Sequence, residues 1–232
     1  MSRPATLSVL AAFTVAGQAL AQSGAVVIAI LPFEDRGSYG QDKEVFRALE
    51  LGIPAALGSE LGRDSRLRLV ERGRVTQALR SQNLAPDARV DAATAAKVAS
   101  QVGARYAITG NFADFYGKFR IDARIVDAES GQILKVVSND DPALQDRAEL
   151  SRILQALGGK IVAAVGLRPS AGTSAGGQAR LPPTEALTQY SLGLLYESEG
   201  ERSKAGEHFQ QAMTAFPNYS EAREAMQRLR AP

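Results

Sequence analysis

Two kinds of apolar run indicate the strands of this chain. Residues 25–31 are an unbroken, largely β-branched apolar run that Pro32 ends, which is typical of a central strand buried on both faces. Residues 119–125 instead alternate apolar with charged side chains, the period of a strand with one face in water. By these patterns the sequence predicts strands at 25–31, 67–70, 106–112, 119–125 and 133–137.

Apolar residues three and four positions apart predict the helices between these strands. The clearest stripe runs from Phe46 to Leu61, where Pro54 predicts a kink or a late helix start and Gly62 is a candidate C-cap. Further helices are expected near residues 75–79, at 92–102 with Asp91 as N-cap, and at 150–165. The order β-α-β-α-α-β-β-β-α predicts an α/β (α+β) fold, a mixed sheet covered by helices.

The first residues have the pattern of an export signal. Arg3 is followed by a short apolar run and by a small-x-small sequence that ends at Ala21, so we expect a secretory signal peptide cleaved between Ala21 and Gln22. The alternative is a buried N-terminal strand or helix. The run is shorter than the roughly 20 residues that span a bilayer. The pattern therefore predicts a periplasmic protein and leaves open a peripheral association with the outer membrane.

A change in composition divides the rest of the chain. Residues 167–183 carry Gly, Ser, Ala and Pro with few apolar side chains, which is the composition of a linker. Because such a linker offers little to bury, we expect the folded units on either side to behave separately. The predicted organisation is a signal peptide (1–21), an α/β domain (22–166), a flexible linker (167–183) and a C-terminal helical unit (184–232).

The C-terminal unit resembles a single tetratricopeptide repeat over about 186–219, followed by a capping helix near 219–230. In a frame that starts at Ala186, only Gln189 departs from the signature, standing where Trp is usual. Small residues would let two antiparallel helices approach, and large ones would fill the seam between them. The matching positions are Leu192, Gly193, Tyr196, Ala205, Phe209, Ala212 and Pro217.

The resemblance also implies a binding surface, since the first helix of such repeats lines a concave groove. It makes Tyr190, Leu194 and Glu197 the candidate protein-binding residues. Packing of Leu194 against the capping helix is an equally good interpretation. One repeat rarely stands alone, because each buries its apolar face on a neighbour. We therefore expect it to dock on the α/β domain, on a second copy or on another protein.

Residues about 25–165 resemble the CsgG family and the amino-terminal domain of TolB-like proteins. The resemblance lies in segments that occur in the same order: 27–35, 69–72, 82–84, 103–110 and 121–131. It implies an anticodon-binding-domain-like fold of the kind used in bacterial envelope assembly proteins. Curli secretion channels of this family also carry a lipidated cysteine and long membrane hairpins. This sequence offers no cysteine and no insert of that length, so the pore activity is not carried over.

Composition narrows the chemistry further. The chain has 232 residues with 27 Lys+Arg, 25 Asp+Glu, one His and no Cys, which excludes thiol catalysis, Cys-ligated metals and a multi-His site. His208 is interpreted as a surface residue, Gly158–Lys160 lacks the rest of a phosphate loop, and Asn139–Asp141 lacks the spacing of a calcium loop. We therefore predict no catalytic, cofactor-binding or metal-binding residue, no cofactor, and a protein that is not an enzyme.

Arginines are concentrated in residues 63–80, where acidic residues interleave with them. One interpretation is a paired and solvated surface, and the other is contact with an anionic envelope partner such as lipid headgroups or cell-wall polymer. The absence of nearby aromatic side chains argues against nucleic acid.

The function predicted from these features is a non-enzymatic exported adaptor or assembly factor of the bacterial cell envelope, which binds an envelope protein through its repeat. The alternatives are an activator of a cell-wall synthase, and a subunit of an outer-membrane secretion or flagellar assembly. A hydrolase is a third class, for which the sequence offers no site. Homo-oligomerisation is left open.

Overall fold

The computed structural model describes residues 24–85, 89–139, 144–168 and 181–230. The predicted cleavage site at Ala21 and Gln22, and most of the predicted linker, lie outside these ranges. The strands are β1 (Val26–Asp35), β2 (Leu67–Leu69), β3 (Tyr106–Phe115), β4 (Lys118–Asp127), β5 (Ile133–Ser138) and β6 (Gln145–Asp146). The helices are α1 (Lys43–Leu61), α2 (Arg72–Ser81), α3 (Ala92–Gln101), the 3-10 turn η1 (Arg147–Glu149), α4 (Leu150–Ala164), α6 (Thr184–Glu199), α7 (Arg202–Ala215) and α8 (Ser220–Arg230).

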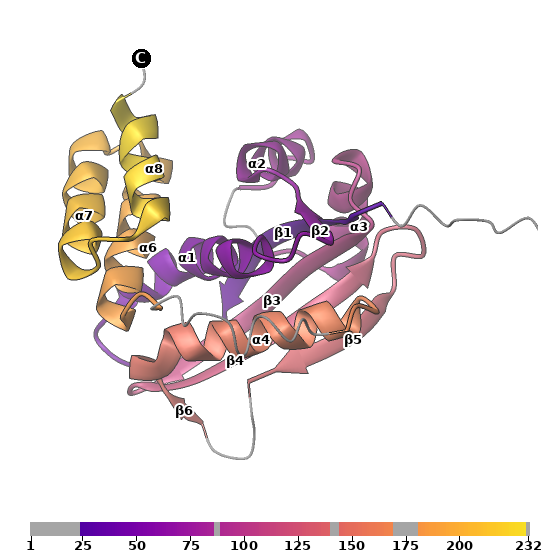
Figure 1. The fold of residues 1–232 in the computed structure, drawn as a ribbon, viewed down its shortest axis with the longest axis horizontal. Helices are drawn as coiled ribbons and strands as arrows, with labels where there is room; N and C mark the ends of the chain where they lie inside the picture. Colours follow the sequence, from indigo (N-terminus) through magenta and orange to yellow (C-terminus); the bar gives the residue numbers. More distant parts are fainter. Residues whose placement is uncertain (1–23, 86–88, 140–143, 169–180, 231–232) are drawn as a thin grey trace, which may run out of the picture.

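The strands form one mixed sheet in the order β2-β1-β3-β4-β5, and the short β6 pairs with β4 beyond the end of β5. β1 is parallel to β2 and to β3, whereas β4 is antiparallel to β3 and to β5. The predicted α/β class and the predicted order of elements are confirmed (Figure 1). β6 has no counterpart in the sequence prediction, because two residues are too few to show a period.

Pro32 does not end the first strand, contrary to the prediction. Ile30 lies opposite Ile108 while Phe33 lies opposite Gly110, so β1 holds one residue more than β3 between these pairs. A bulge of this kind accommodates proline, which has no N–H to donate to the ladder. The extra residue also turns Phe33 onto the face of the sheet where Ile28 lies, so that both join the larger core.

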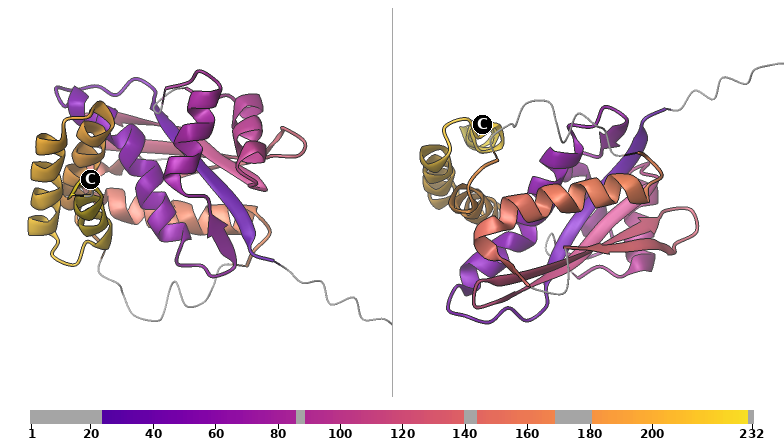
Figure 2. Two further views of the ribbon diagram at one scale, coloured as in Figure 1. Left: turned by 90° about the horizontal axis from the view of Figure 1, so that it is seen from above. Right: turned by 60° about the horizontal axis from the view of Figure 1, so that its bottom comes forward.

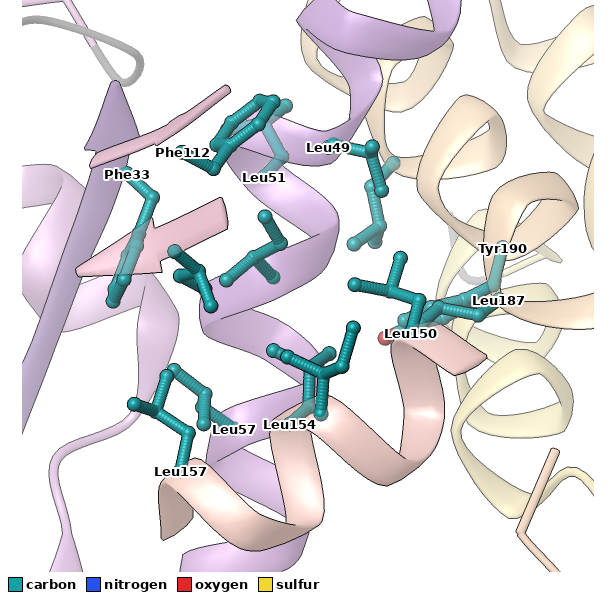
Figure 3. Packing of buried hydrophobic residues seen from close by; sticks show 14 of the residues in the cluster. Phe33, Leu49, Leu51, Leu57, Phe112, Leu150, Leu154, Leu157, Leu187 and Tyr190 are labelled. Atoms are coloured by element: carbon teal, nitrogen blue, oxygen red, sulfur yellow. The ribbon is translucent and has the colours of Figure 1, made fainter. Parts of the chain in front are cut away.

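Helices cover the two faces of the sheet in different ways. α1 and α4 lie across one face and bury the larger core with side chains such as Leu57, Leu154 and Leu157 (Figure 3). α2 and α3 form a smaller core on the other face, against Ala29 and Leu31 of β1. Asp91 begins α3 as predicted, because its side chain accepts a hydrogen bond from the Thr94 backbone N–H at 2.7 Å.

The bounds of α1 refine the predictions for Pro54 and Gly62. α1 starts at Lys43, so Pro54 lies inside it rather than at a late start, and Gly62 is its C-cap with a right-handed φ of −65°. A Cβ on Gly158 of α4 would lie 2.9 Å from Glu60 Cγ of α1. Gly158 therefore lets α4 approach α1 closely at this point.

The C-terminal helices pack directly on the α/β domain. α6 lies beside α1 at one end of the sheet, with α7 and α8 behind it (Figure 2). A Cβ on Gly52 of α1 would lie only 1.8 Å from Ser191 Oγ of α6. The two helices can therefore approach this closely only because residue 52 is a glycine. Arg47 Nη2 also lies 2.7 Å from Glu199 Oε1 across the same interface.

This docking selects the α/β domain among the three partners considered for the repeat. It also corrects the expectation that the two units behave separately. Leu49 of α1, Leu150 of α4 and Leu187 of α6 belong to one continuous hydrophobic cluster (Figure 3). Linker composition gives no information on this point, because it says nothing about the apolar surfaces on either side. The domain boundaries themselves stay predictions.

Candidate protein-binding cleft

A cleft of about 820 Å³ opens where the C-terminal helices meet the α/β domain. Its walls are α1 and α2 on one side and α6 and α8 on the other. The apolar lining comes from β1, β2, α1 and α2 and includes Ile30, Leu31, Pro32, Leu51, Pro54, Leu69, Val75 and Leu79. A concave surface with an apolar lining is the usual form of a binding site.

Charged side chains of both signs line the same cleft. The cations are Arg72, Arg80 and Arg228, and the anions are Glu71, Glu197, Glu221 and Glu224. Arg228 Nη2 lies 3.5 Å from Glu197 Oε2, which joins α8 to α6 across the lining. A mixed arrangement of this kind selects a partner by its pattern of charge rather than by net charge.

Arg72 at the start of α2 faces the C-terminal helices. Solvent reaches this side chain, but desolvation by the surrounding cleft lowers its pKa. Tyr190 and Glu197 raise that pKa electrostatically, and Arg228 lowers it. One cationic group of the α/β domain therefore lies within electrostatic reach of α6 and α8.

Tyr190 is the aromatic centre of this region. Its ring centroid lies 5.8 Å from that of Phe209 and 5.1 Å from that of Tyr219, and 6% of the residue is exposed. Burial raises the pKa of Tyr190 to about 12, although Arg72 and Arg228 oppose the shift. Burial also raises the pKa of Tyr219 well above 10.

The structure separates the three residues predicted to form the repeat groove. Glu197 is half-buried and lines the cleft, as a binding residue should. Tyr190 lines it too but is buried, so the prediction that it lies on an exposed helix face is wrong. Leu194 is fully buried in the common core, which favours the packing interpretation. Tyr190 packs against Phe209 and Tyr219 of the helical unit itself, and both Tyr190 and Leu194 belong to the core that this unit shares with the α/β domain.

The repeat signature residues form the expected seam. A Cβ on Gly193 would lie 2.4 Å from the Phe209 ring, so α6 and α7 approach closely at that point. Tyr196 is half-buried, stacks on His208 with a centroid distance of 5.3 Å and hydrogen-bonds to Glu44 of α1. The remaining signature side chains on α6 and α7 are buried, namely Leu192, Phe209, Ala205 and Ala212. Pro217 follows the end of α7, and α8 is the expected third helix. Assignment to the tetratricopeptide family stays a prediction.

The other residues singled out in the sequence have structural partners. His208 is half-buried rather than on the surface, with Nδ1 2.7 Å from Gln189 Oε1. Asn139 donates to Phe119 O and Gln145 Oε1, both at 3.0 Å, while Asp140 and Asp141 lie outside the described residues.

The arginine-rich segment 63–80 is partly paired, as its first interpretation predicts, while contact with an anionic partner stays a prediction. Arg63 pairs with Glu60 at 2.7 Å and Arg66 pairs with Asp64 at 2.6 Å. Burial raises the pKa of Glu60, and Arg63 opposes that shift. Arg72 and Arg80 instead line the cleft. Sequence reasoning did not connect them with the repeat, because only the docking of α6 on α1 brings α2 near α8.

Ionisation of the buried tyrosines should weaken the fold at high pH. An unfolded chain loses each phenolic proton near pH 10, whereas folded Tyr190 keeps its proton to about pH 12. The unfolded state therefore binds fewer protons in this window, and stability must fall as pH rises, by about 1.4 kcal/mol per pH unit for each such group. We expect the free energy of unfolding measured with urea to decline above pH 10, and less steeply in Tyr190→Phe. The exposed control Tyr116→Phe should keep the wild-type slope. A wild-type slope in Tyr190→Phe would contradict the assignment.

Within the described ranges, no group of three or more His, Asp or Glu side chains is arranged to hold a metal ion. Of the helices that the structure describes, none is both long and apolar enough to cross a membrane.

Comparison with known proteins gives distant structural similarities. No family model matches the sequence, and no curated protein matches it. The LpoB C-terminal domain from Escherichia coli is 16% identical with a TM-score of 0.40, over 50% of this chain and 82% of that one. TolB from Acinetobacter baumannii is 21% identical with a TM-score of 0.32, over 66% of this chain and 29% of that one.

A third similar structure is the PelC dodecamer from Paraburkholderia phytofirmans, at 13% identity and a TM-score of 0.36, over 63% of this chain and 90% of that one. Similarities this distant carry no conclusion about activity or partners. The mixed α/β architecture of this chain rests on its own strands and helices, and the resemblance to the CsgG family stays a prediction.

Proposed function

We propose that this protein is an exported, non-enzymatic adaptor of the bacterial cell envelope that captures a protein partner in the cleft between its α/β domain and its C-terminal helices. The observation that carries the proposal is the construction of the cleft. Its apolar lining belongs to the α/β domain, and much of its charged lining belongs to α6 and α8. The predicted signal peptide supports export, and the periplasm is the proposed location.

The chemistry of the cleft suits a polypeptide. An amphipathic segment can bury apolar side chains against Leu51, Leu69 and Val75 while its charged side chains reach Arg80 and Glu224. Because both signs are present, a uniformly anionic polymer would meet repulsion from the glutamates. These features favour a folded or helical protein segment as the occupant.

Capture should depend on the charged lining of the cleft. Glu197→Ala removes a carboxylate that lies in the lining and is paired only at 3.5 Å. We expect partner affinity to fall about tenfold while the fold is kept, since a charge-assisted contact has roughly that value. The control is Glu207→Ala on α7, which removes an exposed charge that is not part of the cleft lining. Tyr190→Ala is unsuitable, because loss of a buried ring would destabilise the core.

The partner is best identified by crosslinking in intact cells. A photoreactive residue at Thr76 on α2, which lines the cleft, should crosslink a protein that mass spectrometry can identify. The same residue at the exposed Gln210 of α7 serves as the control. Equal crosslinking from both positions, or equal capture by Glu197→Ala and Glu207→Ala, would rule out the cleft as the binding site.

The identity of the captured protein distinguishes the alternative function, an activator of a cell-wall synthase, from other envelope adaptors. Enrichment of a cell-wall synthase favours it, whereas secretion or flagellar outer-membrane components favour an assembly subunit. Turnover that survives purification and is lost on changing one buried acid would instead indicate a hydrolase. A homo-oligomer would appear as capture of a second copy of the chain.

A further inference from the structure

A polar strip runs along β3 and β4 on the sheet face opposite α1 and α4. We define the open strip as Thr109, Asn111, Ala113 and Phe115 of β3 together with Arg124, Asp122, Arg120 and Lys118 of β4. These residues are direct cross-strand partners in that order. At about 3.3 Å per residue the strip is roughly 20 Å long. Towards Lys118 it is open to solvent, since 55% of the Lys118 side chain and 44% of the Arg120 side chain are exposed.

Strand alternation fixes the direction of these side chains. Phe119, Ile121 and Ala123 of β4 are fully buried in the core beneath α1 and α4. The residues between them therefore point to the opposite face. Three cations, Lys118, Arg120 and Arg124, thus lie along β4 with Asp122 among them, and Asp146 of β6 lies 3.5 Å from Lys118 Nζ.

Several polar groups of the strip have partners within the fold. Asp122 accepts a hydrogen bond from Ser138, and Arg120 lies 3.4 Å from it. Arg124 Nε is buried and has no hydrogen-bond partner among the described residues. The residue as a whole is only half-buried, so solvent reaches other parts of Arg124.

Aromatic side chains gather at the end of the strip where the β3–β4 hairpin turns. Tyr39 stacks on Phe115 with a centroid distance of 5.8 Å, and 58% of Tyr39 is exposed. Tyr116 is 83% exposed and has a φ of +54°, followed by Gly117 at +86°. Two-residue hairpin turns of this kind favour Asn or Asp at the first position, so a tyrosine there is unfavourable for the turn itself. Folding gives no reason for it, whereas a binding surface does.

We propose that the open strip binds an extended acidic glycan, a chain of sugar rings that carries carboxylates. Arginine matches carboxylate geometry, and the strip presents Arg120 and Arg124 for that purpose. The Asn111 amide and Asp122 can bond sugar hydroxyls, while the exposed rings of Tyr39 and Tyr116 offer apolar faces for pyranose rings. The rival occupant is an acidic peptide, which would use the cations but has no need of a platform of flat exposed rings.

The test uses the full chain and three probes of matched length: an oligogalacturonate, the neutral maltohexaose and a hexaglutamate peptide. Titration calorimetry at physiological salt should show binding of the oligogalacturonate and at least tenfold weaker binding of both others. Arg124→Gln and Arg120→Gln should each weaken oligogalacturonate binding about tenfold. Tyr39→Ala should also weaken oligogalacturonate binding, although this variant keeps all the cations of the strip. The control Arg152→Gln removes an exposed arginine from α4, across the sheet, and should change nothing.

The outcomes separate the alternatives. Equal or stronger binding of hexaglutamate would replace the glycan by an acidic peptide. Failure of all three probes, or equal weakening by Arg152→Gln, would overturn the strip as a site. Circular dichroism establishes that each variant is folded, and Arg120→Gln tests the proposal even if the half-buried Arg124 proves necessary for the fold. None of these results depends on the cleft, so the proposed protein partner stands or falls separately.

Discussion

Replacing Gly193 by leucine is expected to destabilise the C-terminal helical unit, so that it melts at a lower temperature. A Cβ at this position would lie 2.4 Å from both Phe209 Cδ1 and Cε1, a distance that real side chains do not adopt. Phe209 is fully buried, so its ring has no room to swing aside. Overpacking of this kind costs about 1–3 kcal/mol or more. Helical circular dichroism should fall, and the midpoint of thermal unfolding should drop by roughly 4–10 °C.

The matched control is Gly206→Leu on α7, where a new Cβ would meet nothing within 4 Å. It should leave the midpoint unchanged or raise it, because leucine favours helix over glycine. Partner capture should fail in Gly193→Leu alone, since α6 and α8 supply lining residues of the cleft. Undiminished capture by a melted Gly193→Leu protein would move recognition to the α/β domain and its arginine-rich segment 63–80.

Replacing Gly52 by alanine is expected to loosen the helical unit from the α/β domain. The new methyl group would lie 1.8 Å from Ser191 Oγ and 2.5 Å from Ser191 Cβ, so α6 must move off α1. We expect a loss of about 1–3 kcal/mol in unfolding free energy. Gly58→Ala in the same helix is the control, because its nearest contact would be an ordinary 3.7 Å and alanine is the better helix former.

A second substitution makes this prediction specific. Ser191→Gly removes both clashing atoms and leaves the Ser191 Cα position 3.3 Å from the new methyl group. The double variant Gly52→Ala, Ser191→Gly should therefore recover much of the stability lost in Gly52→Ala, as measured by urea denaturation. Strictly additive losses would mean that Gly52 and Ser191 do not meet.

The sequence predicted the α/β fold well because its signals are periodic. The stripe from Phe46 to Leu61 and the alternation over residues 119–125 both report which face is buried, and both faces lie where expected. The prediction that Pro32 ends the first strand is wrong, because proline ends a regular strand but fits at a bulge. The bulge is visible only in the register of β1 with β3. Docking of the repeat on the α/β domain is one of three arrangements that the sequence allows, and the sequence does not select among them because the helix faces involved look like ordinary apolar faces.

The lining of the cleft is predicted less well for the same reason. The repeat resemblance predicts Glu197 as a binding residue, and its side chain does line the cleft, while its binding role stays a prediction. Tyr190 was placed on a free surface, although the common core covers it. Arg72 and Arg228 are far apart in the chain, and only the tertiary structure places both in the lining of one cleft. Arg124 was seen only as one of the charged residues that alternate along its strand, because an unpaired donor is visible only in three dimensions.

The proposed binding in the cleft would couple the affinity for the partner to the docking of α6 on α1. A ligand that touches both walls binds only molecules in which α6 rests on α1, so its apparent affinity is scaled by the fraction of docked molecules. Conversely, saturation with that ligand shifts the population towards the docked form by its own binding free energy. Substitutions at Gly52, which does not line the cleft, would therefore act on the partner at a distance. The helix interface would set how tightly the partner is held, without any change in the groups that touch it.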